Sequence, residues 1–317
     1  MIQIETLTSG PDAATQKALE SFESEFTYPL GPHQRFGISH GADYTLFARS
    51  MGGAAVYVAL DGAKVIGALS VVLRQLQRPD GSVQPAAYIA DLKVSEEKRG
   101  GFALIKLFKR AFDDFNPLCS IAFGVTMDGT TRIPTNYSGR AGMPLFTPVA
   151  QIAILKVSGP ASQRTYAPTP TNGNARTCTA IATINSAATY RCIAGNSASR
   201  SLIAPQIIST HSGGATAILE DTRRAKILMD DHGREMKNLH LTNLSYQSAA
   251  QCAELIKRAA ATADATGHDG LFVAIPAAHA DEVCEGLQNT NHTVAPATVY
   301  AHGISPQGNW SINTAEI

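Results

Sequence analysis

The first half of the chain alternates short apolar runs with stretches in which apolar residues recur at helical spacing. Apolar runs bounded by turn residues predict β-strands, and the Asp61-Gly62 pair between two such runs predicts a hairpin. An apolar stripe from Leu104 to Phe115 predicts an amphipathic helix that ends before Pro117. The predicted strands are residues 1–8, 54–60, 64–76, 86–94, 121–125 and 149–157, and the other predicted helices are residues 11–26 and 44–50.

Residues 158–176 are dense in proline, glycine, serine, threonine and asparagine, which is typical of a linker. We therefore predict two domains, residues 1–157 and residues 177–317. The order of elements recurs in the second domain while the sequence differs, so the pattern predicts a repeat of architecture. The second domain is predicted to contain strands at residues 178–184, 236–244, 271–275 and 294–301, a hairpin at 215–228, and helices up to about residue 203, at 249–265 and at 278–287.

Composition excludes several classes of protein and ligand. Of the 317 residues, 44% are apolar and 16% are charged, which is typical of a globular chain with a core rather than a disordered one. Lysine plus arginine equals aspartate plus glutamate, 26 each, so no net charge attracts nucleic acid or an anionic membrane. The densest basic cluster, Arg223-Arg224 with Lys226, is interpreted as a solvated hairpin edge.

Further signals concern location and metals. The sequence has no signal peptide and no run of about 18 apolar residues, so it predicts neither secretion nor a membrane span. Five scattered cysteines without a C-x-x-C pair indicate reduced thiols and a cytoplasmic protein. No metal-ligand spacing is present, and residues 230–233 (Asp-Asp-His-Gly) are interpreted as a turn rather than a metal site.

Residues 88–112 carry the clearest chemical signal. A predicted strand runs into the turn Lys98-Arg99-Gly100-Gly101 and then into the start of a helix. Amides at a helix start are unpaired and partly positive, glycines let a bulky anion approach, and the two basic side chains add charge. The segment therefore predicts a cradle for a pyrophosphate. The alternative is a strand-to-helix turn that contains glycines by chance, while Rossmann and P-loop motifs fit less well because their glycine spacings are absent.

The same segment resembles the GNAT (Gcn5-related) N-acetyltransferases, whose signature R/Q-x-x-G-x-G/A follows an L-x-V strand end. The matching residues here are Leu92, Val94, Lys98, Gly101 and Ala103. Lys98 departs from the usual arginine or glutamine. The resemblance covers residues 1–157, whereas the second half is similar only in element order. Its corresponding loop, residues 244–250, has no glycine and no basic residue, so the second half resembles a degenerate repeat.

The resemblance implies two GNAT-like domains, each a mixed, mostly antiparallel twisted sheet flanked by helices, within the α/β (α+β) class. It also implies acetyl-CoA, or another acyl-CoA, as the cofactor. Its pantetheine arm would pair with a strand edge and its pyrophosphate would lie in the cradle. The residues that would bind the cofactor are Leu92, Lys93, Val94, Lys98, Arg99, Gly100, Gly101, Phe102 and Ala103.

The mechanism that the resemblance implies is direct transfer of the acyl group to an amine, with a backbone N–H polarising the thioester carbonyl. On an alternating strand, Ile89, Asp91 and Lys93 share one face and the even-numbered residues share the other. Related enzymes often place an acidic residue at this point. Asp91 is therefore the candidate base or water-orienting group, and an ion pair with Lys93 is the alternative.

Tyr137 is the candidate acid for the leaving thiolate, although its spacing to the next glycine is one residue longer than in the family. The alternative is an ordinary half-buried tyrosine. The acceptor would lie against residues 27–50, within the stretch 27–53 that is predicted to be largely irregular, because long irregular segments in compact domains are usually functional or disordered. The candidate acceptor-binding residues there are Tyr28, His33, Arg35, Phe36, His40 and Tyr44.

The leading hypothesis is an acetyl-CoA-dependent N-acetyltransferase that acts on a small amine or a peptide N-terminus. A longer acyl donor is a second possibility, because a groove between two domains would accommodate it. A non-catalytic acyl-CoA-binding or sensing protein is the third, and Lys98 and the stretched segment after Tyr137 favour it. The sequence identifies neither the acceptor nor the oligomeric state.

Overall fold

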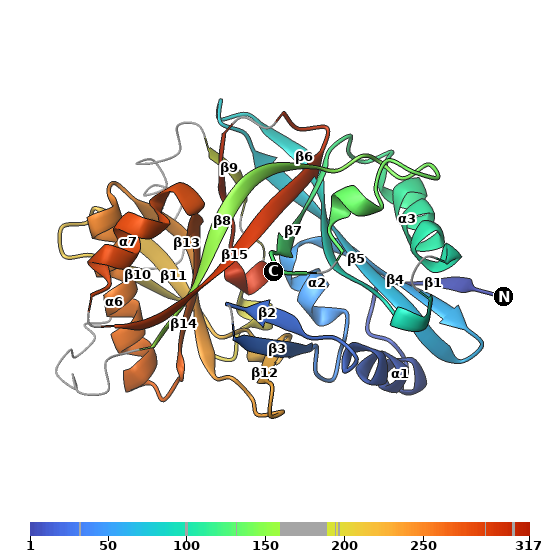
Figure 1. Ribbon diagram of the computed structural model, residues 1–317, viewed down its shortest axis with the longest axis horizontal. Coiled ribbons are helices and arrows are strands. Elements are labelled where there is room, and N and C mark those ends of the chain that lie inside the picture. The colour runs from blue at the N-terminus through green and yellow to red at the C-terminus, as the bar shows by residue number, and fades with distance from the viewer. Residues whose placement is uncertain are drawn as a thin grey trace.

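A computed structural model describes residues 1–31, 33–98, 101–130, 132–158, 189–193, 195, 197–288, 290–305 and 308–317. The predicted fold class is confirmed, since the chain is a mixed α/β structure built on one large mixed sheet with helices on its faces (Figure 1). Most of the predicted linker 158–176, and the strand predicted at 178–184, lie outside the described residues.

Local sequence signals account for most elements of the first half. The Asp12 side chain caps the first helix by accepting a hydrogen bond of 2.7 Å from the Thr15 amide. Gly62 has φ of 63° in the predicted hairpin turn, a conformation that glycine adopts readily. The elements are β1 (Gln3–Leu7), α1 (Ala13–Glu23), β2 (Tyr28–Leu30), β3 (Gln34–Ser39), α2 (Leu46–Met51), β4 (Gly53–Asp61), β5 (Lys64–Gln77), β6 (Val83–Val94), η1 (Glu96–Lys98), α3 (Phe102–Phe115), β7 (Ala122–Met127), η2 (Pro134–Asn136) and β8 (Thr147–Ser158).

The second half broadly repeats this order, but Thr189–Cys192 is a strand where the sequence predicts helical segments up to about residue 203. Its long helix begins at the cap residue Ser248, whose hydroxyl accepts from the Gln251 amide. The elements are β9 (Thr189–Cys192), α5 (Ser197–Arg200), β10 (Gln206–Ser209), β11 (Ala215–Glu220), η4 (Thr222–Arg224), β12 (Ile227–Asp230), β13 (Asn238–Tyr246), α6 (Ala249–Ala265), β14 (Gly270–Pro276), η5 (Ala277–His279), α7 (Ala280–Gly286), β15 (Asn291–His302), β16 (Asn309–Ser311) and η6 (Thr314–Glu316).

The two halves share the main sheet, whose strand order is β1-β4-β5-β6-β7-β15-β8-β14-β13-β11-β10. β15 pairs with β7 on one side and with β8 on the other, and β8 also pairs with β14. Each half therefore places its last long strand beside strands of the other half. β8 and β15 lie between the N-terminal elements and the C-terminal elements in Figure 1.

A second sheet of three strands, in the order β12-β3-β2, corrects two predictions. Residues 27–53 are expected to be largely irregular, but β2 and β3 form an antiparallel pair there. Residues 215–228 are expected to form a hairpin, but β11 belongs to the main sheet and β12 pairs with β3, from Ile227 opposite Ser39 to Asp230 opposite Phe36. Local sequence indicates a strand but not its distant partner, which explains both differences.

The parallel strands β6 and β7 are paired only over Ala87–Ile89 of β6, and beyond this point they separate. β6 also contains a bulge at Asp91 and Leu92, which together lie opposite Leu69 of β5. Asp91 has φ of 53°, a conformation that few residues other than glycine adopt. The opening between β6 and β7 is therefore built into the backbone.

The bulge corrects the predicted alternation of side chains along β6. Ile89, Leu92 and Val94 all pack toward α3, whereas Asp91 and Lys93 lie on the opposite face. The prediction that Ile89 shares the face of Asp91 is wrong because the extra residue of the bulge shifts the two-residue period by one.

The second half also contains a parallel strand pair that ends at a bulge. β13 and β14 are parallel and paired from Asn238 to Leu241, after which β13 bulges at Asn243 and Leu244. Asn243 has φ of 50°, close to the 53° of Asp91. The predicted repeat of architecture is thus present down to the backbone conformation of one residue in each half.

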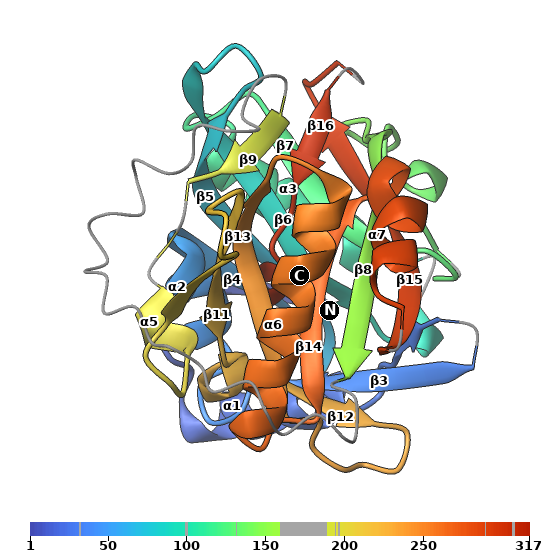
Figure 2. The same ribbon diagram turned by 90° about the vertical axis from the view of Figure 1, so that its left-hand side faces the viewer.

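Helices cover the sheet where the sequence stripes predict. α3 packs its Leu107 and Ala111 against β4 and β5, and α6 covers β13 and β14 (Figure 2). Leu107 is fully buried, and burial of a leucine side chain contributes about 1.5–3 kcal/mol. The opposite face of β4, β5 and β6 packs against α1 and α2 in the largest core. None of the described helices is long and apolar enough to cross a membrane.

Candidate functional site

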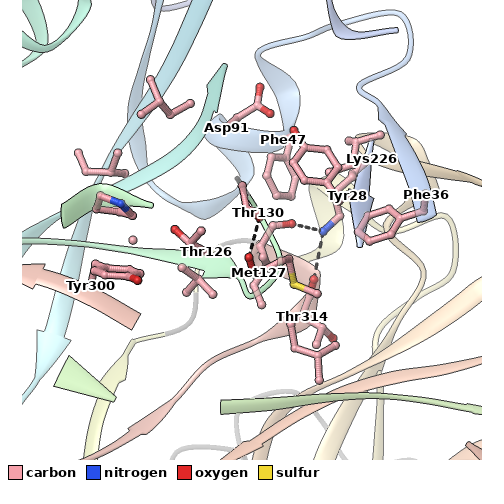
Figure 3. A pocket seen from close by; sticks show the side chains of 18 of the residues that line it. Tyr28, Phe36, Phe47, Asp91, Thr126, Met127, Thr130, Lys226, Tyr300 and Thr314 are labelled. Carbon is pink, nitrogen blue, oxygen red and sulfur yellow. Dashed lines mark hydrogen bonds between the residues drawn. The ribbon is translucent and has the colours of Figure 1, made fainter. Parts of the chain in front are cut away.

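A cavity of about 210 Å³ occupies the opening between β6 and β7. Leu30 and Ile154, from the core under α1 and α2, line it on one face of the sheet, and Phe108 and Phe146, beside α3, line it on the other. The cavity therefore passes through the sheet. Its polar lining residues are Tyr28, His40, Asp91, Thr126, Thr130, Arg132, Tyr137, Lys226, His240, Tyr300 and Thr314. Figure 3 labels Tyr28, Asp91, Thr126, Thr130, Lys226, Tyr300 and Thr314 among them.

Gly124 of β7 stands at the point where the two strands part and lines the cavity. A Cβ atom at this position would lie 2.8 Å from the carbonyl oxygen of Ile89, so a side chain would push the strands apart. Glycine thus permits close pairing at the apex of the opening.

Asp91 is buried and held by neighbours on both carboxylate oxygens. Its Oδ1 forms an ion pair with the Lys93 ammonium, and its Oδ2 accepts a hydrogen bond of 2.5 Å from the Tyr44 hydroxyl. Burial acts to raise the pKa of Asp91, but the charge of Lys93 and the hydrogen bonds from Lys93 and Tyr44 outweigh it and lower the pKa. The ion pair weighed as an alternative is present, and it keeps Asp91 ionised.

His40 and Glu23 form a second buried polar pair at the cavity. Nδ1 of His40 lies 2.7 Å from Oε2 of Glu23, and both side chains are almost completely buried. Nε2 of His40 lies 3.9 Å from Oδ2 of Asp91. The imidazole therefore stands between two carboxylates.

Lys226 enters the cavity from the second half (Figure 3). Its Nζ donates hydrogen bonds to the main-chain oxygens of Thr314, at 3.1 Å, and Ile317, at 2.6 Å, and lies 4.9 Å from the centre of the Phe47 ring. Burial, together with the charge of Arg200, lowers the pKa of Lys226 to about 7. The prediction of a solvated edge is wrong for Lys226, because the segment after η4 turns inward to form β12.

A buried ionic network holds η6 against the cavity. Oε1 of Glu316 lies 3.2 Å from both Nη2 of Arg74, in β5, and Nη1 of Arg200, in α5. Arg200 also pairs with Glu220 at 2.8 Å. The network joins the two halves. The C-terminal end of the chain lies near the middle of the molecule in both views (Figures 1 and 2).

The equivalent opening in the second half is occupied by the residue that precedes η6. Oδ1 of Asn313 accepts a hydrogen bond of 2.9 Å from the amide of Asn243 at the bulge of β13. Next to it, the Thr314 hydroxyl donates to the carbonyl oxygen of Phe272 in β14. The bulge amide of the second half thus binds a carbonyl oxygen supplied by the chain itself.

The bend predicted to cradle a pyrophosphate is described only in part, because Arg99 and Gly100 lie outside the described residues. Gly101 is the cap residue of α3, and Phe102 is 71% exposed. Lys98 forms an ion pair with Asp61 at 2.9 Å on the surface. Ala103 is buried beneath the helix start. The start of α3 is therefore open on the side of Phe102.

The structure places some of the predicted site residues on one cavity. Six of them line it, namely Tyr28, Phe36, His40, Asp91, Leu92 and Tyr137. Tyr44 lies behind Asp91 and donates to it. His33 and Arg35 are exposed, and Arg35 donates to the side chain and carbonyl of Thr27 on the outer hairpin, so neither is placed at the cavity.

Tyr137 follows η2 and lies opposite Phe108, with 6.3 Å between ring centroids. Burial raises the pKa of Tyr137, and the nearby Tyr300 adds to the effect, so its hydroxyl stays protonated at neutral pH. Lys226, His240, Tyr300 and Thr314 are lining residues that the sequence did not indicate. They come from the second half, and no local motif marks them.

Solved structures with a similar fold include acyltransferases. Yeast (Saccharomyces cerevisiae) N-myristoyltransferase with bound myristoyl-CoA aligns over 99% of this chain and 83% of its own, with 11% identity and a TM-score of 0.58, and its complex with inhibitors gives 0.60 at 10% identity. A GCN5-related N-acetyltransferase from Anabaena variabilis aligns over 94% of this chain and 72% of its own, with 13% identity and a TM-score of 0.50. In sequence, no family model and no curated protein matches. The chain thus has the GNAT fold over nearly its whole length, in two consecutive copies.

Proposed function

We propose that this protein is an N-acyltransferase that transfers the acyl group of an acyl-CoA directly to an amine. The observation that carries the proposal is the cavity through the sheet between β6 and β7, which ends at a buried, ionised carboxylate. The pantetheine arm would lie along the edge of β6 beyond Ile89, where β7 has parted from it. Its amides would then pair with the strand as an added strand does.

The internal repeat supports a site for the thioester carbonyl. In the second half, the amide of Asn243 binds the side-chain carbonyl oxygen of Asn313. Asp91 has the equivalent place and backbone conformation in the first half. We propose that the Asp91 amide binds the thioester oxygen in the same way, and that its N–H stabilises the negative charge of the tetrahedral intermediate.

Side chains of the first half would then act on the two reacting groups. The carboxylate of Asp91 stays ionised, so it can attract and orient the positively charged acceptor amine. Tyr137 stays protonated and lines the same cavity, so it can give its proton to the leaving thiolate. Tyr28, Phe36 and His40 would form the wall for the acceptor.

Acetyl-CoA is the simplest donor, and a longer acyl donor is the second candidate. The cavity favours the longer acyl donor, because the cavity is lined mostly by apolar side chains on both faces of the sheet. An apolar cavity of about 150 Å³ is enough to bind benzene, whereas an acetyl group adds only one methyl to the carbonyl. The yeast enzyme with the same fold binds myristoyl-CoA, which fits this direction.

Calorimetric titration of the wild-type protein with CoA, acetyl-CoA, octanoyl-CoA and myristoyl-CoA tests the proposal together with an assay for free thiol. We expect binding of CoA, and release of thiol with at least one donor when ethanolamine, tyramine, spermidine or trialanine is added. Binding without thiol release from any pair would indicate the sensing protein instead. Absence of CoA binding would remove the whole proposal.

Gly101→Asp is expected to weaken CoA binding by at least about tenfold while the protein remains folded. An aspartate is a preferred cap residue and suits a helix start, so α3 should be as stable as before. The same negative charge repels a diphosphate at the helix start, and a loss of about 1.4 kcal/mol of binding free energy is tenfold. Titration and thermal melting measure the two effects. Gly101→Ser, which caps without charge, is the control and should bind as the wild type does.

A further inference from the structure

We propose that His40, oriented by Glu23, takes the proton from the acceptor amine, and that Asp91 orients the amine rather than accepting its proton. The inference rests on the proposed acyl transfer and assigns a catalytic residue to it. It starts from the arrangement in which one imidazole links two buried carboxylates at the cavity.

Glu23 fixes the position of the His40 ring. Oε2 of Glu23 lies 2.7 Å from Nδ1 of the ring, and the amide of His40 donates to both oxygens of the same carboxylate, at 3.1 and 3.3 Å. The rings of Tyr44 and Phe47 pack beside the imidazole, with centroids at 4.5 and 5.5 Å. A carboxylate that accepts from Nδ1–H keeps the proton on Nδ1 and leaves a lone pair on Nε2, as a catalytic histidine base requires.

The second ring nitrogen of His40, Nε2, faces Asp91. Nε2 of His40 lies 3.9 Å from Oδ2 of Asp91, which is too long for a direct hydrogen bond. An amine nitrogen about 3 Å from both atoms could donate one hydrogen to each. Both residues line the cavity, so the acceptor amine would be held there by Asp91 and His40 together.

Asp91 is less suited to accept the proton itself. Its two oxygens already face the Lys93 ammonium and the Tyr44 hydroxyl, both of which stabilise the carboxylate in its ionised form. His40, in contrast, lines the cavity, and its Nε2 lies 3.9 Å from Oδ2 of Asp91. The other charged or titratable groups around His40 and Asp91 are Glu23, Lys93, Lys226, Tyr28 and Tyr44.

The acceptor ammonium first loses one proton to solvent and becomes a neutral amine. Nε2 of His40 then removes a second proton as the amine nitrogen forms a bond to the thioester carbonyl carbon. The tetrahedral intermediate collapses by breaking the C–S bond, and Tyr137 or water protonates the thiolate. The products are an amide and CoA, and the imidazolium then returns its proton to the group that protonated the thiolate, through solvent.

The tautomer of the ring tests the arrangement without any knowledge of the acceptor. Two-bond proton–nitrogen NMR of the protein labelled with ¹⁵N-histidine, with the His40 signal assigned by its loss in His40→Gln, reports which nitrogen carries the proton in the neutral ring. We expect Nδ1–H in the wild type and a mixture of tautomers in Glu23→Gln. A neutral ring protonated at Nε2 would overturn the proposal.

Activity provides the second test. His40→Ala should release thiol about 10²- to 10⁴-fold more slowly than the wild type, with unchanged CoA affinity, and added imidazole should restore part of the rate. His232→Ala, at an exposed turn, is the matched control and should keep the wild-type rate. Full activity of His40→Ala would refute the proposed role of His40 but not the proposed acyl transfer. A wild-type protein that is inactive with all donors and amines would instead refute the proposed acyl transfer.

Discussion

Asp91→Asn is expected to slow acyl transfer by about 10²- to 10⁴-fold, because the acceptor amine loses the charge that orients it beside the base. It should leave CoA affinity unchanged, since the proposed contact of this residue with the thioester is through its amide. The same substitution leaves the buried Lys93 ammonium without its partner, which costs about 3–5 kcal/mol of the free energy of unfolding. Thiol release, CoA titration and urea unfolding measure the three effects.

A double variant separates the chemical effect from the structural one. Asp91→Asn combined with Lys93→Met removes both members of the buried pair, so most of the lost stability should return, because replacing a whole buried pair is often neutral. Transfer should remain slow. Recovery of both stability and transfer in the double variant would show that Asp91 contributes only to folding.

Glu316→Gln is expected to lower the free energy of unfolding by about 3–5 kcal/mol, because it leaves the buried guanidinium group of Arg74 without a counter-charge and leaves Arg200 with Glu220 alone. Transfer should fall as well, since η6 begins at Thr314, which lines the cavity. Urea unfolding and thiol release measure the two losses. Asp113→Asn, which removes an exposed ion pair with Lys109 on α3, is the control and should change neither.

The same network predicts how stability depends on pH. Burial acts to raise the pKa of Glu316, but the charges of Arg74 and Arg200 outweigh it, and the pKa lies below the ordinary value of 4.5. A carboxylate with a lowered pKa in the folded state contributes stability above its unfolded pKa and loses it as pH falls through the folded pKa. Stability of the wild type should therefore fall below about pH 4.5, and Glu316→Gln should show a shallower fall. Equal slopes in the two proteins would contradict this origin.

The elements that the sequence predicts well are those that depend on local signals. The helix predicted at residues 249–265 has these bounds in the structure, because a serine cap and a regular apolar stripe define it. The D-G hairpin and the strand-turn-helix segment around residues 88–112 are also present. Motif spacing alone identified the part of the chain where β6 and β7 separate.

The remaining features depend on contacts between residues far apart in the chain. Local sequence does not indicate that β12 pairs with β3 or that β15 lies between β7 and β8. An apolar strand can pair with several different neighbours, so its own residues do not identify its partner. The bulge at Asp91 could not be predicted, since a single extra residue changes no composition. Lys226 resembles an exposed lysine in sequence, and only the inward turn after η4 makes it a cavity residue.

The reciprocal placement of β8 and β15 has a consequence for how the chain is made. During synthesis β7 and β8 emerge long before β15, so their facing edges stay without the strand that belongs between them until β15 has also left the ribosome. Unpaired edges of this kind favour association with other chains, and pairing over such sequence separation is slow. Neither half can complete its own sheet, so the two copies of the fold must reach the native state as one cooperative unit.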